Sequence, residues 1–208
     1  MKQQKAIIFD DHRLFSDSFS SILEKAEIFT SVHSFFDEKL LIRFLMLESP
    51  NPTVLFLDFL LVERNSLHLI NETRRLNRNL KIIIVSGVTS PALVKSILNY
   101  RPQGFISKFS GFDMVVECLN KNADGRQFIC PEIKKILSTV DRATQIHFTS
   151  RELQLLQYFD QGNSIMKTAE LVHLSKHTVV SHRRTMMKKA NCNSITELLA
   201  FARQHGLI

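Results

Sequence analysis

The sequence predicts a doubly wound α/β domain with a five-stranded parallel sheet, followed by an all-α domain of four helices. Three observations carry this prediction. Short apolar runs alternate with amphipathic segments through residues 1–124, only helical periodicity follows residue 149, and positive charge gathers in the C-terminal part. With 208 residues, the chain is long for one compact domain and sufficient for two small ones.

Apolar runs predict the five strands, and the segments between them predict the helices. The expected strands are residues 6–9, 29–34 (the weakest), 54–57, 81–85 and 105–107. The expected helices are residues 13–25, 36–48, 66–77, 91–99 and 111–123. Uninterrupted apolar runs suit strands that are buried on both faces of a parallel sheet, and alternating β and α units place helices on both faces through right-handed crossovers.

The pattern changes after residue 124, so we expect a first domain at 1–124, a linker at 125–147 and a second domain at 148–208. The linker should hold one short helix at 131–140. Its remaining residues, 141–147, are polar.

Capping signals define the helices of the second domain. Thr149 and Glu152 have capping-box spacing, and Gly162 should end the helix that they begin. Further helices are expected at 164–172, from Lys176 to about Lys189 with Ser175 as its cap, and at 194–204. A helix, the tight connection 173–175 and a second, basic helix form the core of a helix-turn-helix.

Polar residues follow the predicted strands. Asp10 and Asp11 come after the first strand, Asp58 after the third, Ser86 and Gly87 after the fourth, and Lys108 after the fifth. An acidic pair after a strand is commonly a solvated loop. Ligands of a doubly wound sheet, however, bind beyond the carboxyl ends of its strands, and all these residues fall at that edge.

Three close carboxylates repel one another, and a divalent cation relieves the repulsion. Magnesium, which prefers oxygen ligands, suits such a site. Asp58 is then the candidate nucleophile for a phosphoryl group, Lys108 a positive charge on one phosphoryl oxygen, and Ser86 a hydrogen-bond donor to another, with Gly87 leaving room. Phosphatases of the haloacid dehalogenase type are excluded because they require Asp-x-Asp, and His12 follows the adjacent pair.

These residues make 1–124 resemble the receiver domain of response regulators, which has a flavodoxin-like fold. The resemblance implies that Asp58 accepts a phosphoryl group from a histidine kinase or phosphotransfer protein. It implies that Asp10, Asp11, Asp58 and the backbone carbonyl of Phe59 bind Mg²⁺. It also implies that phosphorylation draws Ser86 inward and lets Phe105, three residues before Lys108, rotate inward.

The loop after Asp58 departs from that family. Receivers commonly have Met-Pro and then a Gly four residues beyond the Pro, where this chain has Leu61-Val62 and Ser66. We therefore expect a loop of different shape.

The third helix of the second domain has a polar face suited to the major groove of DNA, which is about 12 Å wide. This face carries His177, Ser181, Arg184 and Lys188 at helical spacing, whereas Val179, Met186 and Ala190 should face the core. Arg184 suits guanine edges. Arg183, Lys188 and Lys189 suit phosphates, and so does the helix N-terminus at 175–178.

Charge supports a polyanionic partner for the second domain. Residues 125–208 carry 12 Lys and Arg against 6 Asp and Glu, whereas residues 1–124 carry 15 against 14. A generally basic surface for solubility explains the excess equally well when charge is taken alone.

Thr149-Ser-Arg-Glu152, Gly162-Asn-Ser164, Ala169 and Leu174-Ser175-x-x-Thr178-Val179-x-x-His182 resemble the LuxR-type helix-turn-helix. With the receiver, nearly the whole chain resembles NarL/FixJ-type response regulators. The resemblance implies a transcription factor, not an enzyme. It also implies that the protein binds double-stranded DNA as a homodimer, whose subunits often contact each other through the last helix. The expected DNA contacts are Lys176, His177, Thr178, Val180, Ser181, Arg183, Arg184 and Lys188. Val180, where Lys is usual, and Ile195, where Arg is common, are departures; Val180 offers an apolar contact, as to a thymine methyl.

Two other functions remain open from the residues: a receiver-type module whose helical domain binds protein, and a DNA-binding protein that works without phosphorylation. Basic residues such as Arg183 and Arg184 argue against the first, and the complete acidic pocket argues against the second. No apolar run reaches the roughly 18 residues of a membrane-spanning helix. The start of the chain reaches acidic residues, Asp10 and Asp11, too soon for a signal peptide, so we expect a cytoplasmic protein without a membrane partner.

Overall fold

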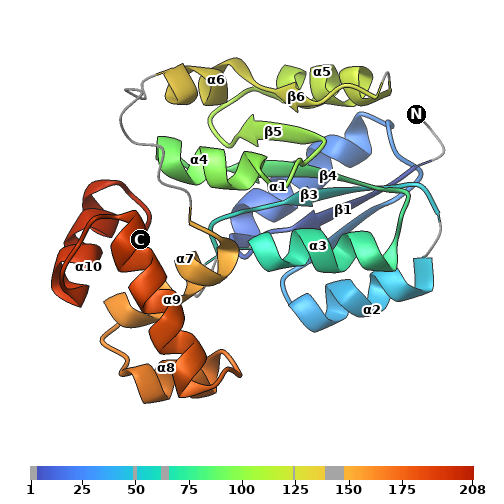
Figure 1. Ribbon diagram of the computed structural model, residues 1–208. Coiled ribbons are helices and arrows are strands. Elements are labelled where there is room, and N and C mark those ends of the chain that lie inside the picture. Colours follow the sequence, from blue (N-terminus) through green and yellow to red (C-terminus); the bar gives the residue numbers. More distant parts are fainter. Residues whose placement is uncertain (1–3, 49–50, 62–65, 124, 139–147) are drawn as a thin grey trace. The chain divides into compact units, whose positions relative to one another are not determined.

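The structure, a computed structural model, describes residues 4–48, 51–61, 66–123, 125–138 and 148–208 (Figure 1). The chain packs as two units, residues 1–88 with 100–135 and residues 89–99 with 136–208. The domain boundaries expected at 124 and 148 stay predictions. The linker residues 141–147 lie outside the described residues.

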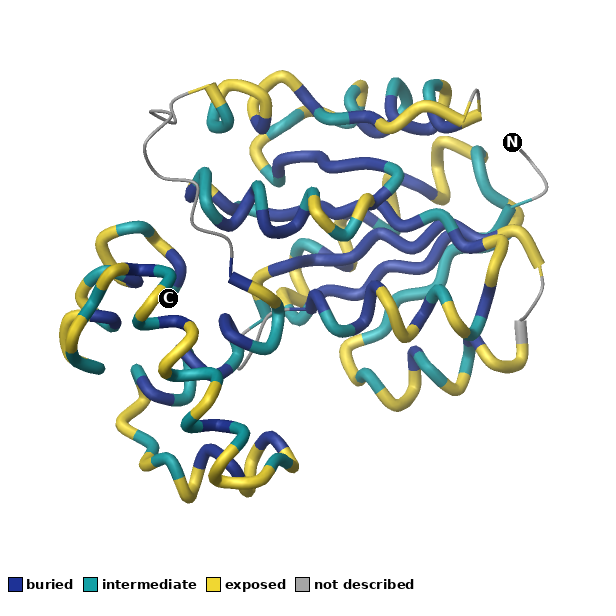
Figure 2. Tube along the Cα trace, in the orientation of Figure 1, coloured by how far each residue is buried: buried dark blue, intermediate teal, exposed yellow. Residues whose placement is uncertain are grey.

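A parallel sheet forms the centre of the first unit. Its strands lie in the order β2-β1-β3-β4-β5-β6. Their bounds are β1 Lys5–Phe9, β2 Val32–Phe35, β3 Thr53–Leu57, β4 Leu80–Ser86, β5 Gly104–Ser107 and β6 Phe128–Ile129. Every residue of β3 and β5 is buried, and Figure 2 shows the central strands buried along their length. The sequence prediction of a doubly wound parallel α/β fold is confirmed.

The predicted number of strands was too low. A sixth strand, β6, pairs with β5 and is the outermost strand on that side of the sheet. It contains only Phe128 and Ile129, which align with Gly104 and Phe105. Two residues are too few for any periodicity, so only the tertiary pairing reveals this strand. The weak second strand also lies slightly later than expected, at Val32–Phe35.

Helices connect the strands near their predicted positions. Their bounds are α1 Arg13–Lys25, α2 Glu38–Glu48, α3 Leu67–Leu76, α4 Pro91–Leu98, α5 Phe112–Ala123 and α6 Pro131–Ser138. On α1, Phe19 packs edge-on against Phe56 of β3, with ring centroids 5.1 Å apart. A Cβ atom at Gly104 would lie 2.4 Å from Cys118 Sγ of α5, so a side chain at this position would force α5 away from β5.

Four helices of the second unit lie at α7 Ser150–Asp160, α8 Ile165–Leu171, α9 Lys176–Lys189 and α10 Ile195–Gln204. The expected capping box is present, since Thr149 accepts from the Glu152 N–H and Glu152 accepts from the Thr149 N–H. Ser175 caps α9 by accepting from the Thr178 N–H. Gly162, after α7, has a positive φ of 81°, which favours glycine. No helix in the described part of the chain is both long and apolar enough to span a lipid bilayer.

Glu152 also joins two of these helices. Its side chain is only 4% exposed, and its Oε2 lies 2.6 Å from Lys189 Nζ at the end of α9. The same oxygen accepts the Thr149 N–H at 2.7 Å. One carboxylate therefore completes the start of α7 and neutralises a cation at the end of α9.

We predict that Glu152→Gln lowers the opening free energy of α7 and α9 by about 3 kcal/mol, because it leaves Lys189 without its buried partner and weakens the capping box. Native-state hydrogen exchange of the full chain measures this value. Glu170→Gln is the matched control, since Glu170 pairs with Lys167 at the surface with 64% of its side chain exposed, and it should cost less than about 0.5 kcal/mol. Equal losses in the two variants would contradict the prediction.

Candidate functional site

The carboxyl edge of the sheet brings two acids and one base into contact. Asp10 follows β1 and Asp58 follows β3, and each is only 2% exposed. Lys108 follows β5, and its Nζ lies 2.7 Å from Asp10 Oδ2 and 2.7 Å from Asp58 Oδ2. The Lys108 backbone N–H donates to the Ser86 carbonyl, which anchors the base of the side chain. The structure thus assembles the residues that the strand ends indicated.

Burial controls the ionisation of this group. Removal from water raises the pKa of Asp58, the hydrogen bond and charge of Lys108 oppose that rise, and the charge of Asp10 adds to it. Burial alone would lower the pKa of Lys108, but its hydrogen bonds to Asp10 and Asp58 raise it. The ammonium is therefore held in its charged form between two carboxylates, with its Nζ 4.6 Å from the centroid of the Phe15 ring.

The same edge holds a set of side chains that could ligate a cation. One ligand atom each from Asp10, Asp11, His12 and Asp58 lies within 4.8 Å of all the others. Three carboxylates are the oxygen donors that a hard divalent cation prefers, so the donor set fits such an ion. His12, whose Nδ1 is 3.1 Å from Asp11 Oδ1, was not assigned a role from the sequence, although it directly follows the acidic pair.

The expected backbone ligand, the Phe59 carbonyl, follows Asp58 in the chain and already accepts the Ser66 N–H at 3.1 Å. The Ser66 hydroxyl donates to the Asp58 carbonyl at 2.5 Å, and Ser66 is fully buried. Where the receiver family commonly has Gly, this chain therefore has a side chain that ties the start of α3 to the backbone of Asp58. Val62 lies outside the described residues.

Ser86 and Phe105 are both fully buried. Among the described residues, the Ser86 hydroxyl has no hydrogen-bond partner. An unpaired buried hydroxyl costs free energy, and a phosphoryl oxygen at this edge would satisfy it. Next to it, a Cβ at Gly87 would meet nothing closer than the Phe109 ring at 3.9 Å, so Gly87 does leave room. Rotation of Phe105 on phosphorylation stays a prediction.

In the second unit, α9 presents the expected polar face. The exposed members of the predicted DNA contacts are Lys176, His177, Ser181, Arg184 and Lys188, and the partly buried members are Thr178, Val180 and Arg183. The Thr178 hydroxyl lies 2.8 Å from the Ser175 hydroxyl, so Thr178 also takes part in the helix cap. Val179, Met186 and Ala190 are buried, as predicted.

Lys189 was expected to contact a DNA phosphate. In the structure its ammonium instead pairs with the buried carboxylate of Glu152. Sequence position alone could not distinguish it from Lys188, since the partner lies 37 residues away on another helix.

Comparison with known proteins identifies both parts of the chain. Residues 6–120 match the response regulator receiver domain family, and residues 147–202 match the luxR family of bacterial regulatory proteins. The chain belongs to the response regulator family. It is a response regulator with a receiver domain followed by a LuxR-type DNA-binding domain, which confirms the resemblance inferred from the motifs.

Relatives support this organisation over the full length. Fimbriae Z protein of Salmonella typhimurium is 23% identical over 100% of both chains, and transcriptional regulatory protein DegU of Brevibacillus brevis is 22% identical over 97% of this chain and 94% of its own. Response regulator UvrY of Escherichia coli is 29% identical over 66% of this chain and 67% of its own. RcsB of Salmonella enterica serovar Typhimurium, solved bound to promoter P1flhDC with a phosphomimetic, shares the fold with a TM-score of 0.75, at 21% identity over 98% of this chain and 100% of its own.

We predict that Mg²⁺ raises the melting temperature of the receiver domain, because a cation bound to the native carboxylates stabilises only the folded state. At a concentration ten times the dissociation constant the gain is about 1.4 kcal/mol. Differential scanning calorimetry of the full chain measures the shift. Asp10→Asn should abolish it, and Asp17→Asn, at an exposed aspartate of α1 outside the cluster, should leave it unchanged. The same shift in both variants would exclude the acidic cluster as the metal site.

Proposed function

We propose that this chain is a transcription factor that is switched by phosphorylation of Asp58, with a histidine kinase or a phosphotransfer protein as the donor. The observation that carries the proposal is the buried contact of Lys108 with both Asp10 and Asp58 at the carboxyl edge of a receiver fold. We place this activity in the cytoplasm, where the DNA and the kinase domain would be available.

In the proposed reaction, one Oδ atom of Asp58 forms a bond to phosphorus while the bond from phosphorus to the donor nitrogen breaks. The donor keeps the electron pair of that bond and takes up a proton. Lys108 moves its hydrogen bond from the Asp58 carboxylate to a phosphoryl oxygen. Asp10, Asp11, Asp58 and the Phe59 carbonyl would hold Mg²⁺, which would supply positive charge to the phosphoryl group.

The response would begin at Ser86, whose hydroxyl is buried without a partner among the described residues. Donation from this hydroxyl to a phosphoryl oxygen satisfies it and favours the inward position of Phe105. A local change of charge then shifts the balance between two packing arrangements of the receiver.

In the second unit, α9 would enter the major groove of double-stranded DNA. Arg184, which is exposed near the middle of the helix, suits bidentate recognition of guanine, and Lys188 suits a phosphate. A homodimer formed through α10 in the active state would read two half-sites. RcsB structures that contain dimers bound to DNA support this assignment, and so does the DNA-binding family of residues 147–202.

Asp58→Ala should abolish phosphorylation by acetyl phosphate and Mg²⁺, because it removes the nucleophile. A phosphate-affinity gel measures the retarded band. Asp17→Ala, at an exposed aspartate, should keep the band. A retarded band that persists in Asp58→Ala would assign the phosphoryl group to another residue.

Arg184→Ala should cost about 1–3 kcal/mol of binding to the preferred duplex and relax the preference at one base pair. Lys188→Gln should weaken binding to all duplexes alike and make the salt dependence shallower by about one unit. Duplexes selected from a random pool, titrated at several salt concentrations, provide the measurement. Binding to no duplex, even at low salt, would contradict DNA binding by this domain.

A further inference from the structure

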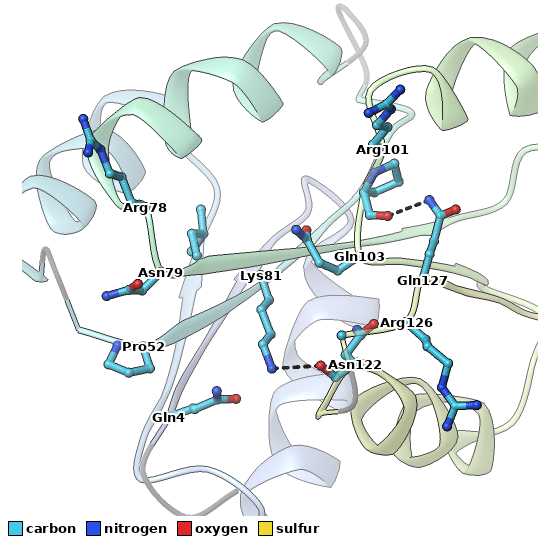
Figure 3. A pocket seen from close by; sticks show the side chains of 13 residues that line it. Gln4, Pro52, Arg78, Asn79, Lys81, Arg101, Gln103, Asn122, Arg126 and Gln127 are labelled. Atoms are coloured by element: carbon cyan, nitrogen blue, oxygen red, sulfur yellow. Dashed lines mark hydrogen bonds between the residues drawn. The ribbon is translucent and has the colours of Figure 1, made fainter.

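A second pocket lies at the amino edge of the sheet, opposite the edge that carries Asp58. The segments that precede β1, β3, β4, β5 and β6, with the first residues of β4 and the end of α5, line an open pocket of about 740 Å³ (Figure 3). Its lining is Gln4, Pro52, Arg78, Asn79, Leu80, Lys81, Arg101, Pro102, Gln103, Asn122, Gly125, Arg126 and Gln127. All of these residues belong to the first unit.

The charged lining residues are all basic. They are Arg78, Lys81, Arg101 and Arg126, and the described lining contains neither Asp nor Glu. Composition hides this bias, because residues 1–126, which include all four cations, carry 16 Lys and Arg against 14 Asp and Glu. The positive charge is therefore local, and it comes from the start of β4 and from three loops that are far apart in the sequence.

Figure 3 shows how the four cations are arranged. Lys81 lies near the middle of the pocket, and its Nζ donates to the Asn122 carbonyl at 3.3 Å, which leaves other ammonium protons available. Arg78, Arg101 and Arg126 are exposed and surround it with their guanidinium groups turned outward. Their long side chains can swing inward over a ligand at the cost of side-chain entropy.

Hydrogen bonds fix the backbone that carries this rim. Gln103 Oε1 accepts the Ile82 N–H at 2.9 Å, and Gln127 Nε2 donates to the Pro102 carbonyl at 2.8 Å. Arg101 has a φ of 50°, in the left-handed region that side chains rarely adopt. Arg74 holds this turn, because its guanidinium donates to the carbonyl of Arg101 at 2.5 Å.

A simpler explanation is that basic residues collect near the carboxyl ends of helices, where they interact with the helix dipole. It accounts for Lys81, which contacts a carbonyl in the last turn of α5. The same effect favours Arg78, Arg101 and Arg126, because α3, α4 and α5 end at Leu76, Leu98 and Ala123, two or three residues before them. The helix ends therefore explain the sign of the charge, and the pocket that these residues line together is the feature that points to a ligand.

We propose that this pocket binds a small molecule of nucleotide size that carries two or more phosphate groups. The volume falls within the usual range for small-molecule sites, about 300–1,000 Å³. Arginine recognises phosphate through paired N–H donors, and three arginines suit more than one phosphate. The carboxamide of Gln4 offers a donor and an acceptor for a base or sugar, and the pocket also has apolar lining.

Duplex DNA is the less suitable occupant of this pocket. Its phosphates lie on a convex surface and are usually contacted by protruding helices and loops, whereas this positive charge surrounds a hollow. Because the pocket is at the opposite edge of the sheet from Asp58, the proposal is independent of phosphorylation.

Isothermal titration of the full chain with ATP in EDTA at low salt tests the proposal. EDTA keeps divalent cations away from the acidic cluster. We expect saturable binding of one ATP per chain, at least tenfold weaker in the double variant Lys81→Gln, Arg101→Gln. The matched control Arg43→Gln, Arg75→Gln removes two exposed arginines outside the pocket, and it should bind ATP like the unmodified chain. Asp58→Ala should also bind normally.

Three results would overturn the proposal. The first is ATP binding that fails to saturate, and the second is an equal loss of ATP affinity in the double variant and its control. The third is that Lys81→Gln, Arg101→Gln weakens binding of a short DNA duplex but leaves binding of ATP unchanged. Circular dichroism establishes that each variant is folded. If the double variant is unfolded, Arg78→Gln and Arg126→Gln replace it, because both positions are exposed. These rim variants should each weaken ATP binding, and unchanged affinity in both would equally refute the pocket.

Discussion

The bridge from Lys108 to Asp10 and Asp58 is the interaction on which the receiver pocket depends. Two buried carboxylates at neighbouring strand ends would repel each other, and one ammonium at 2.7 Å from each offsets that repulsion. Lys108 follows β5, whereas the acids follow β1 and β3, so the side chain must reach across the end of β4. The strand order, the buried sheet and the charge of the pocket therefore depend on one another.

Much of this site follows from the sequence because its members occupy equivalent positions. Asp10, Asp58, Ser86 and Lys108 each come at or directly after the end of an apolar run, and parallel strands bring such positions to one edge. The apolar runs also predicted the helical crossovers, since buried parallel strands leave few other arrangements. Conversely, β6 escaped prediction because Phe128 and Ile129 form a strand only by pairing with β5.

What the sequence did not reveal depends on individual contacts between distant residues. In the sequence, Ser66 is only a departure from a family pattern. In the structure, its hydroxyl donates a hydrogen bond to the Asp58 carbonyl. Lys189 resembled any other basic residue of α9, because its partner Glu152 lies on α7. The basic pocket was invisible for a related reason. Its arginines come from three separate loops and its lysine from the start of β4, so no stretch of the sequence shows the cluster.

The shared carboxylate of Glu152 has a consequence for how α9 would approach DNA. Because this carboxylate holds the first turn of α7 and the last turn of α9 at once, α9 cannot pivot at its carboxyl end without breaking a partly buried ion pair and weakening a helix cap. The helix is thus presented at a set angle before any encounter, and little orientational freedom is lost on docking. Selection among DNA sequences would then depend mainly on the side chains of α9 and on the deformability of the duplex, because the α7–α9 contact keeps the helix in place.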